Sequence, residues 1–177
     1  MEFIESGLDG VMVVQQEAFP DNRGHFMETF RARDFNTTFV QDNMSVSKVG
    51  VIRGLHYQLQ YPQAKLVTVM RGSILDVAVD IRKGSPTFGK FFPIVLISGY
   101  SKRLLIPVGF AHGFQALENN TVVHYKCSDY YYGAGARTIR YDDPAIGIPW
   151  NKLPVIISDK DKDSPLLKDA EVFEYNQ

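Results

Sequence analysis

The sequence predicts an all-β fold of the sandwich, barrel or jelly-roll type. Short runs of β-branched, aromatic and other apolar residues recur along the chain, and Gly, Pro, Asn or Asp separates them. Segments with a helical period are scarce. No low-complexity linker divides the 177 residues, so we expect one domain over residues 1–177.

The expected strands follow one another in chain order, each bounded by turn-forming residues. They are residues 10–14, 24–30, 51–58, 65–70, 74–81, 92–97, 103–106, 113–117 and 121–127. Arg71, Gly72 and Ser73 separate two apolar runs, which predicts that residues 65–70 and 74–81 form a hairpin. Short helices are predicted around residues 33–39 and after Ser158.

Composition and charge narrow the classes of partner. The formal net charge is −1 and no basic run is present, which argues against nucleic acid. Cys127 is the only cysteine, so an intrachain disulfide is impossible and a reducing compartment is expected. The N-terminus lacks a signal-peptide pattern, and no apolar run approaches the roughly 18–20 residues that cross a bilayer. We therefore expect a cytoplasmic protein without a membrane partner.

Arg53 and His56 lie three residues apart in one expected strand. A histidine exchanges protons near neutral pH, and an arginine is a planar clamp for anions. Together with Lys65 they predict an enzyme acting on an anionic, phosphorylated small molecule. Strict alternation would put Arg53 and His56 on opposite faces, so a shared pocket requires a bend near Gly54. A buried structural histidine is the alternative for His56.

Alternation also assigns the faces of residues 121–127. Val123, Tyr125 and Cys127 share the apolar side, so Tyr125 is expected to point into the barrel and His124 away from it. A tyrosine holds its proton at neutral pH and is therefore a candidate acid. The alternative is an ordinary core tyrosine.

Two further positions have two interpretations each. Asp161 follows Ser158 by three residues, which fits a helix cap as well as a carboxylate that orients the base. His112 lies in a glycine-flanked turn and is either a ligand contact or a structural histidine. No two histidines have the spacing of a metal site, so no metal is predicted.

Seven segments, taken together and in order, closely resemble the dTDP-4-dehydrorhamnose 3,5-epimerases, which are dimeric cupin-type jelly rolls. They are residues 21–28, 39–45, 53–56, 76–82, 85–89, 106–114 and 158–161, and the resemblance extends over about residues 3–167. It implies a cupin-type jelly roll, or double-stranded β-helix, with short peripheral helices. It also implies a homodimer whose substrate is a dTDP-4-keto-6-deoxysugar and whose reaction needs no cofactor.

The resemblance also implies roles for individual residues. His56 matches the general base paired with Asp161, Tyr125 the general acid, and Lys65 the lysine near the carbon-4 carbonyl. The base would remove a proton at carbon 3 or 5, and the acid would return one to the other face of the ring. The matching substrate contacts are Arg53, His112, Gln41, Asn43, Tyr131 and Lys160, with Arg23, Phe26 and Glu28 reaching across the dimer interface.

The chain departs from the family pattern at two positions. Ala64 replaces a usual glycine, and Ala136 stands where members often have a glutamate, which puts one nucleotide contact in doubt. Other functions stay open: a mono-epimerase or 3,4-ketoisomerase on a similar sugar, a metal-dependent cupin oxygenase, or a non-catalytic sugar-nucleotide binding module.

Overall fold

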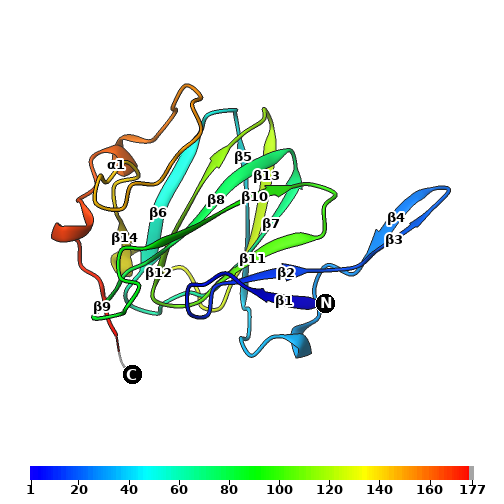
Figure 1. Ribbon diagram of the computed structural model, residues 1–177, viewed down its shortest axis with the longest axis horizontal. Helices are drawn as coiled ribbons and strands as arrows, with labels where there is room; N and C mark the ends of the chain where they lie inside the picture. Colours follow the sequence, from blue (N-terminus) through cyan, green and yellow to red (C-terminus); the bar gives the residue numbers. More distant parts are fainter. Residues whose placement is uncertain (176–177) are drawn as a thin grey trace.

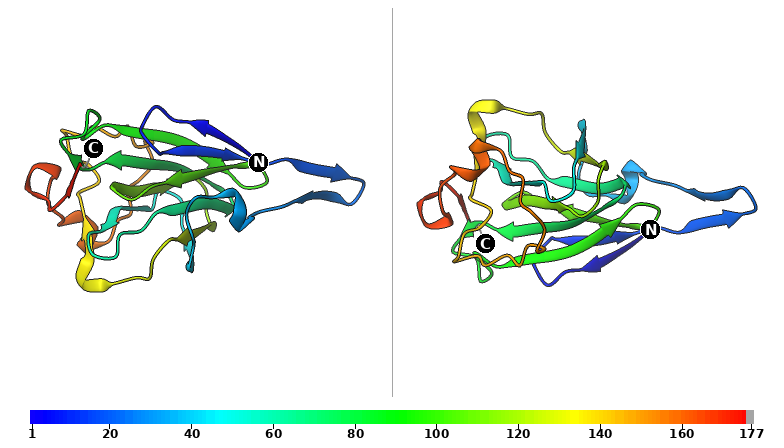
Figure 2. Two further views of the ribbon diagram at one scale, coloured as in Figure 1. Left: turned by 90° about the horizontal axis from the view of Figure 1, so that it is seen from below. Right: turned by 90° about the horizontal axis from the view of Figure 1, so that it is seen from above.

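The computed structural model describes residues 1–175 and is built mainly from two antiparallel β-sheets (Figures 1 and 2). The six-stranded sheet has the strand order β1-β2-β11-β7-β13-β5, and the five-stranded sheet has the order β10-β8-β12-β6-β14. The two sheets form a jelly roll of the cupin type, which confirms the predicted fold class.

The elements have the following bounds. The six-stranded sheet contains β1 (Glu2–Glu5), β2 (Met12–Gln15), β11 (Lys102–Ile106), β7 (Lys65–Arg71), β13 (Thr121–Cys127) and β5 (Gln41–Ser47). The five-stranded sheet contains β10 (Phe91–Ile97), β8 (Ser73–Asp80), β12 (Phe110–Ala116), β6 (Ile52–Gln58) and β14 (Ala136–Thr138). Outside them lie the hairpin of β3 (Ala18–Asp21) and β4 (Gly24–Met27) and the parallel pair of β9 (Arg82–Lys83) and β15 (Phe173–Glu174). The helical pieces are α1 (Asp159–Lys162) and the 3-10 turns Ala32–Asp34, Gly133–Gly135 and Leu167–Asp169.

The core lies between the sheets, and a second apolar cluster covers the outer face of the five-stranded sheet. Alternate residues of β8 serve both: Ile74 and Ala78 face the inter-sheet core, while Val77 and Val79 pack against Ile139 and the C-terminal segments. Burial of both faces explains why residues 74–81 form an almost continuous apolar run.

The predicted hairpin between residues 65–70 and 74–81 is wrong. Both strands exist, but β7 pairs with β11 and β13 in one sheet, whereas β8 pairs with β10 and β12 in the other. Gly72 turns the chain from one sheet to the other with a φ of +76°, and a Cβ there would lie 2.5 Å from Thr121 Oγ1. The glycine marks a corner between sheets, and the same local sequence fits either kind of turn.

The two predicted helices are shorter than expected. Around residues 33–39 the chain makes only the 3-10 turn Ala32–Asp34, because Phe35 and Phe39 pack with Phe30 in an aromatic cluster against the six-stranded sheet. After Ser158 the helix α1 is present as a single turn. Within residues 1–175, no helix has the length and apolar character needed to span a membrane.

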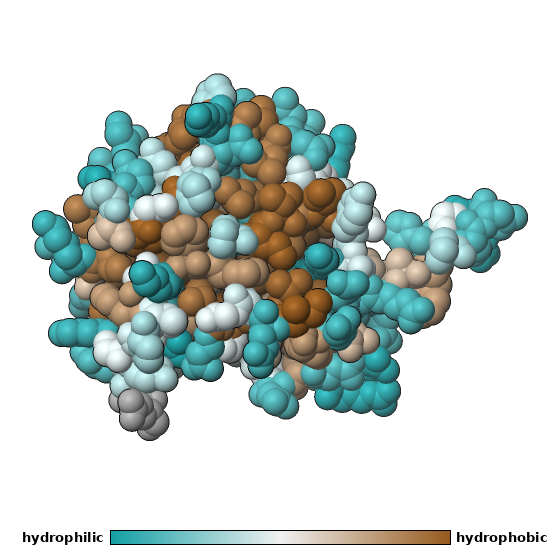
Figure 3. Space-filling model, viewed as in Figure 1, coloured by the Kyte–Doolittle hydropathy of each residue, from teal (hydrophilic) through white to brown (hydrophobic). Residues whose placement is uncertain are grey.

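The β3–β4 hairpin projects from the body (Figures 1 and 2). Only its second strand was predicted, and that strand ends at Met27 where residues 24–30 were expected. Phe19 and Phe26 are opposite each other on it, and the Phe26 side chain is 69% exposed. Figure 3 shows apolar side chains gathered over the centre of the body and hydrophilic ones at the tip of this hairpin.

Candidate active site

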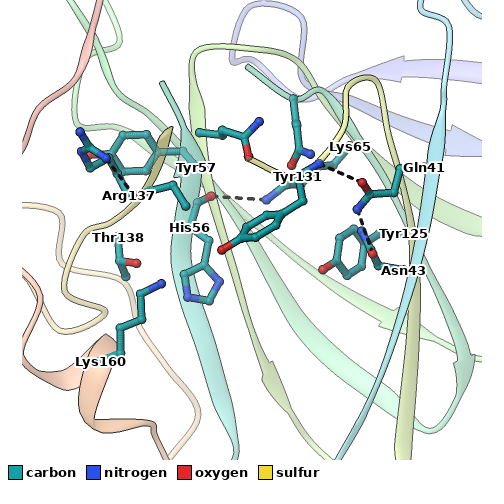
Figure 4. Close-up of a pocket in the computed structure, with 13 residues that line it drawn as sticks. Gln41, Asn43, His56, Tyr57, Lys65, Tyr125, Tyr131, Arg137, Thr138 and Lys160 are labelled. Carbon is teal, nitrogen blue, oxygen red and sulfur yellow. Dashed lines mark hydrogen bonds between the residues drawn. The ribbon is translucent and has the colours of Figure 1, made fainter. Parts of the chain in front are cut away.

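One cavity of about 440 Å³ opens between the two sheets and receives side chains from both (Figure 4). From the six-stranded sheet come Gln41, Asn43, Lys65 and Tyr125, and from the five-stranded sheet come His56 and further residues of β6 and β14. The other lining residues are Tyr57, Gln58, Gln63, Tyr131, Ala136, Arg137, Thr138 and Lys160.

A bulge in β6 resolves the conflict over Arg53 and His56. His56 is opposite His112 and Arg53 is opposite Phe114, so β6 uses three steps where β12 uses two. The extra residue puts Arg53 and His56 on the same face, as the expected bend near Gly54 requires. Gly54 has a φ of +129°, and a Cβ there would lie 2.5 Å from Gly113 Cα, so no other residue fits.

His56 is hydrogen-bonded to Asp161, with 2.8 Å between Nε2 and Oδ1. Asp161 Oδ2 accepts a bond from the Gly54 backbone N–H, and its own backbone N–H donates to Ser158 Oγ at 3.2 Å. Both interpretations of Asp161 therefore describe the structure: the cap holds the residue in α1, and its carboxylate reaches the histidine. Burial alone would raise the pKa of Asp161, but the hydrogen bonds from His56 and Gly54 hold it below its ordinary value.

Lys65 is half-buried in the wall of the cavity, and its Nζ lies 3.5 Å from the His56 carbonyl oxygen. Burial lowers the pKa of Lys65, and the nearby Cys127 and Asp76 partly oppose that shift. The lysine thus places its amino group in the same cavity as His56.

Tyr125 points into the barrel, as its alternation predicts. Its ring packs against the inter-sheet core, and the residue lines the same cavity as His56 and Lys65. Burial raises the pKa of Tyr125. Its hydroxyl therefore keeps a proton well above neutral pH. His124 lies on the opposite face, 3.6 Å from Asp42.

A second histidine–carboxylate pair lies behind this cavity. His112 Nε2 and Asp76 Oδ1 are 2.7 Å apart, and both side chains are buried. Burial lowers the pKa of His112, with Lys65 and His56 adding to the shift and Asp76 opposing it. Asp76 was not predicted as a site residue. Its signal in the sequence is a carboxylate on the inward face of an apolar strand.

Arg53 faces an adjoining cavity of about 530 Å³ that His56, Lys160 and Asp161 also line. Its guanidinium donates to Ser47 Oγ at 3.1 Å and to the Val46 carbonyl at 3.3 Å. His56 and Lys160 belong to both cavities, whereas Lys65 belongs only to the first. Lys65 and Arg53, the two positive residues predicted to lie beside His56, therefore line different cavities, and His56 lies between them.

Gln41, Asn43 and Tyr131 form part of the rim of the first cavity. Gln41 Oε1 accepts from the Tyr131 backbone N–H at 2.9 Å, and Gln41 Nε2 donates to Asn43 Oδ1 at 3.1 Å (Figure 4). The Tyr131 side chain is 65% exposed.

Arg23, Phe26 and Glu28 lie on or next to the projecting hairpin and do not line the cavity of their own chain. The Arg23 side chain is 85% exposed and paired with Asp21.

Several cavity residues were not predicted from the sequence. Arg137 is the one with the clearest charge, and its guanidinium is fixed by the Ala134 carbonyl at 2.8 Å and by Glu171. In the sequence it is an isolated basic residue beyond the last predicted strand, so no pattern identifies it. Within residues 1–175, no three His, Cys, Asp or Glu side chains gather in a way that could hold a metal ion.

Comparison with known proteins gives concordant results. The family model described as dTDP-4-dehydrorhamnose 3,5-epimerase matches residues 5–169. The epimerase of that name from Methanothermobacter thermautotrophicus is 45% identical, over 97% of this chain and 97% of its own length. A 3,5-epimerase from Legionella pneumophila, crystallised with dTDP-4-keto-L-rhamnose, is 40% identical with a TM-score of 0.95, and the match covers 99% of both chains. A 3'-monoepimerase from Streptomyces bikiniensis, in complex with dTDP-quinovose, is 30% identical with a TM-score of 0.86, covering 92% of this chain and 86% of its own.

Proposed function

Because this chain belongs to the dTDP-4-dehydrorhamnose 3,5-epimerase family, we propose that the cavity between its two sheets is where its epimerase reaction takes place. The chain is an isomerase of a dTDP-linked 4-keto sugar. Its reaction converts dTDP-4-dehydro-6-deoxy-D-glucose to dTDP-4-dehydro-L-rhamnose by inversion at carbons 3 and 5. The observation that carries the assignment of residues is that His56, Lys65 and Tyr125 line one cavity.

His56 is the general base. Its hydrogen bond to Asp161 orients the imidazole and stabilises the imidazolium that forms when the ring takes a proton from carbon 3 or carbon 5. Both carbons are adjacent to the carbonyl at carbon 4, so the electron pair of the broken C–H bond moves to the carbon-4 oxygen as an enolate.

Lys65 stabilises that oxygen. Lys65 presents its amino group to the cavity, and in its protonated form this group donates a hydrogen bond to the developing negative charge. His112 is held by Asp76, and burial lowers its pKa, so at neutral pH it adds no second positive charge beside Lys65.

Tyr125 is the general acid. It gives its proton to the face of the ring opposite His56, and inversion follows because the proton leaves and returns on different faces. A single residue doing both would tend to restore the starting configuration. The raised pKa of Tyr125 keeps the proton in place until the enolate forms.

The nucleotide is bound at the rim. Tyr131 is exposed there and offers a flat ring on which the thymine base of the nucleotide can stack, with Gln41 and Asn43 beside it. Arg53 and Lys160 supply positive charge for the diphosphate from the adjoining cavity. Ala136 offers no carboxylate to this region.

The protein acts as a homodimer in which Arg23, Phe26 and Glu28 serve the partner's cavity. An isolated two-stranded hairpin is marginally stable in water, and this one exposes Phe19 and Phe26. A second copy that covers the hairpin would bury these rings. The lone cysteine, Cys127, supports a cytoplasmic location.

Incubation with dTDP-4-keto-6-deoxyglucose in D2O tests the reaction directly. Deuterium at both carbon 3 and carbon 5, counted by NMR, is the expected result. Label at one carbon only would make the protein a mono-epimerase, the activity named for the Streptomyces bikiniensis neighbour. No label at either carbon, with the sugar nucleotide still bound, would overturn the roles of His56 and Tyr125.

A further inference from the structure

The segment between β13 and β14 presents Tyr131 at the cavity rim with little packing around its ring. The side chains of Tyr130, Tyr131 and Tyr132 are all exposed. Residues 128–132 belong to neither sheet, so regular strand pairing does not fix them. The position of the Tyr131 ring therefore depends on what holds the backbone on either side of it.

Three glutamine side chains hold that backbone. Gln63 Nε2 donates to the Asp129 carbonyl at 2.8 Å, and Gln41 Oε1 accepts from the Tyr131 N–H at 2.9 Å. Gln58 makes two of the bonds: its Nε2 donates to the Tyr130 carbonyl at 3.0 Å, and its Oε1 accepts from the Tyr132 N–H at 2.8 Å. Gln58 alone therefore holds the chain on both sides of Tyr131.

Gln58 is well suited to fix a loop. The residue is only 4% exposed, and its Nε2 also donates to the Tyr61 carbonyl. It lies two residues after His56 on β6. One strand thus carries both the proposed base and the side chain that holds the tyrosine segment, which fixes the distance between the two ends of the site.

We propose that Gln58 is a positioning residue that holds Tyr131 ready to stack on the nucleotide base. This rests on the proposed function, in which Tyr131 contacts the base. Gln58 contributes to affinity through Tyr131 and takes no part in proton transfer. Removing its amide frees the backbone at Tyr130 and Tyr132, so the ring must be ordered each time a ligand binds.

Calorimetric titration of the full-length protein with dTDP tests this in a double-mutant cycle. Gln58→Leu is expected to raise the Kd about 10-fold, since stacking of a base on an aromatic ring is worth that much or more. In a Tyr131→Ala background the same change should add little, because the ring it positions is gone. With saturating substrate, the rate of deuterium incorporation should stay close to that of the wild type while KM rises.

Gln115 provides a matched control. It is fully buried, bonds both the N–H and the carbonyl of Asn151, and does not line the cavity. Gln115→Leu should lower Tm without changing the Kd for dTDP. Gln58→Glu keeps the side-chain volume but loses the donor, and it provides a folded variant if Gln58→Leu fails to fold.

The outcomes separate two claims: that Gln58 positions Tyr131, and that the nucleotide binds at this rim. An equal rise in Kd in the wild-type and Tyr131→Ala backgrounds, or an unchanged Kd in both Gln58 variants, would overturn the positioning role while leaving the epimerase function in place. A wild-type protein that does not bind dTDP would overturn the proposed nucleotide site, and the role of Gln58 with it.

Discussion

His56 is the residue on which the proposed chemistry depends most. His56→Asn removes the proton acceptor but leaves a polar side chain of similar size, so the dTDP affinity and Tm should change little. Turnover should fall by about 100-fold or more, as for other lost general bases. His124→Asn is the matched control, because His124 also faces a carboxylate but lies outside the cavity. Steady-state rates that are similar for the His56 variant and the wild type would contradict the assignment.

Asp161, the hydrogen-bond partner of His56, should also make the stability of the fold depend on pH. Its pKa is lowered in the folded state, so its contribution to stability is fully present above the unfolded value of about 3.9 and is lost as the pH falls through the folded pKa. Thermal unfolding of the wild type and of Asp161→Asn should therefore show a higher Tm for the wild type at pH 5. This gap in Tm should shrink below about pH 4. A gap that widens between pH 5 and pH 3 would contradict the lowered pKa of Asp161.

At the scale of elements, local pattern predicted most strands and the orientation of Tyr125, because alternation is a property of a single strand. It did not predict that β7 and β8 pair with other strands in different sheets, and it did not predict the role of Asp76. A glycine turn looks the same whether the chain reverses within a sheet or crosses to the other, and only the packed core decides. The sequence shows Asp76 as an unusual carboxylate on an apolar strand, but its partner is recognisable only when β12 brings His112 beside it.

The single turn of α1 is small, yet it places Asp161 against His56. Ser158→Ala removes the oxygen that accepts from the Asp161 N–H, which should cost about 1 kcal/mol in the free energy of unfolding. Because Asp161 would then be less well held, kcat should fall several-fold with KM almost unchanged. Ser164→Ala is the control, since its hydroxyl bonds the Lys160 carbonyl at the other end of the same turn. If both variants lower kcat equally, the effect belongs to the turn as a whole and the cap has no special role.

At the scale of the whole molecule, the residues of the proposed substrate site lie partly in the jelly-roll body and partly on the projecting β3–β4 hairpin. His56, Lys65 and Tyr125, to which the proposal gives the catalytic roles, lie inside the jelly roll, where two sheets hold them. Arg23 and Phe26 lie on a hairpin that projects from the body (Figure 1) and do not line that cavity. The resemblance to the family implies that these residues contact the substrate, but a sequence motif contains no information about which copy of the chain they serve. The division of the site between two chains is therefore a prediction about assembly.

Mixing two impaired variants tests whether the hairpin of one chain serves the cavity of the other. Arg23→Ala should weaken substrate binding by removing a contact from the hairpin, and His56→Asn should abolish proton abstraction. In a mixed dimer, the protomer with an intact His56 would receive an intact Arg23 from its partner, so one complete site forms. Random exchange of protomers should then restore about a quarter of the wild-type activity at substrate concentrations below KM. If each hairpin served its own chain, no combination of the two variants would contain a complete site, and the mixture would be no more active than its parts.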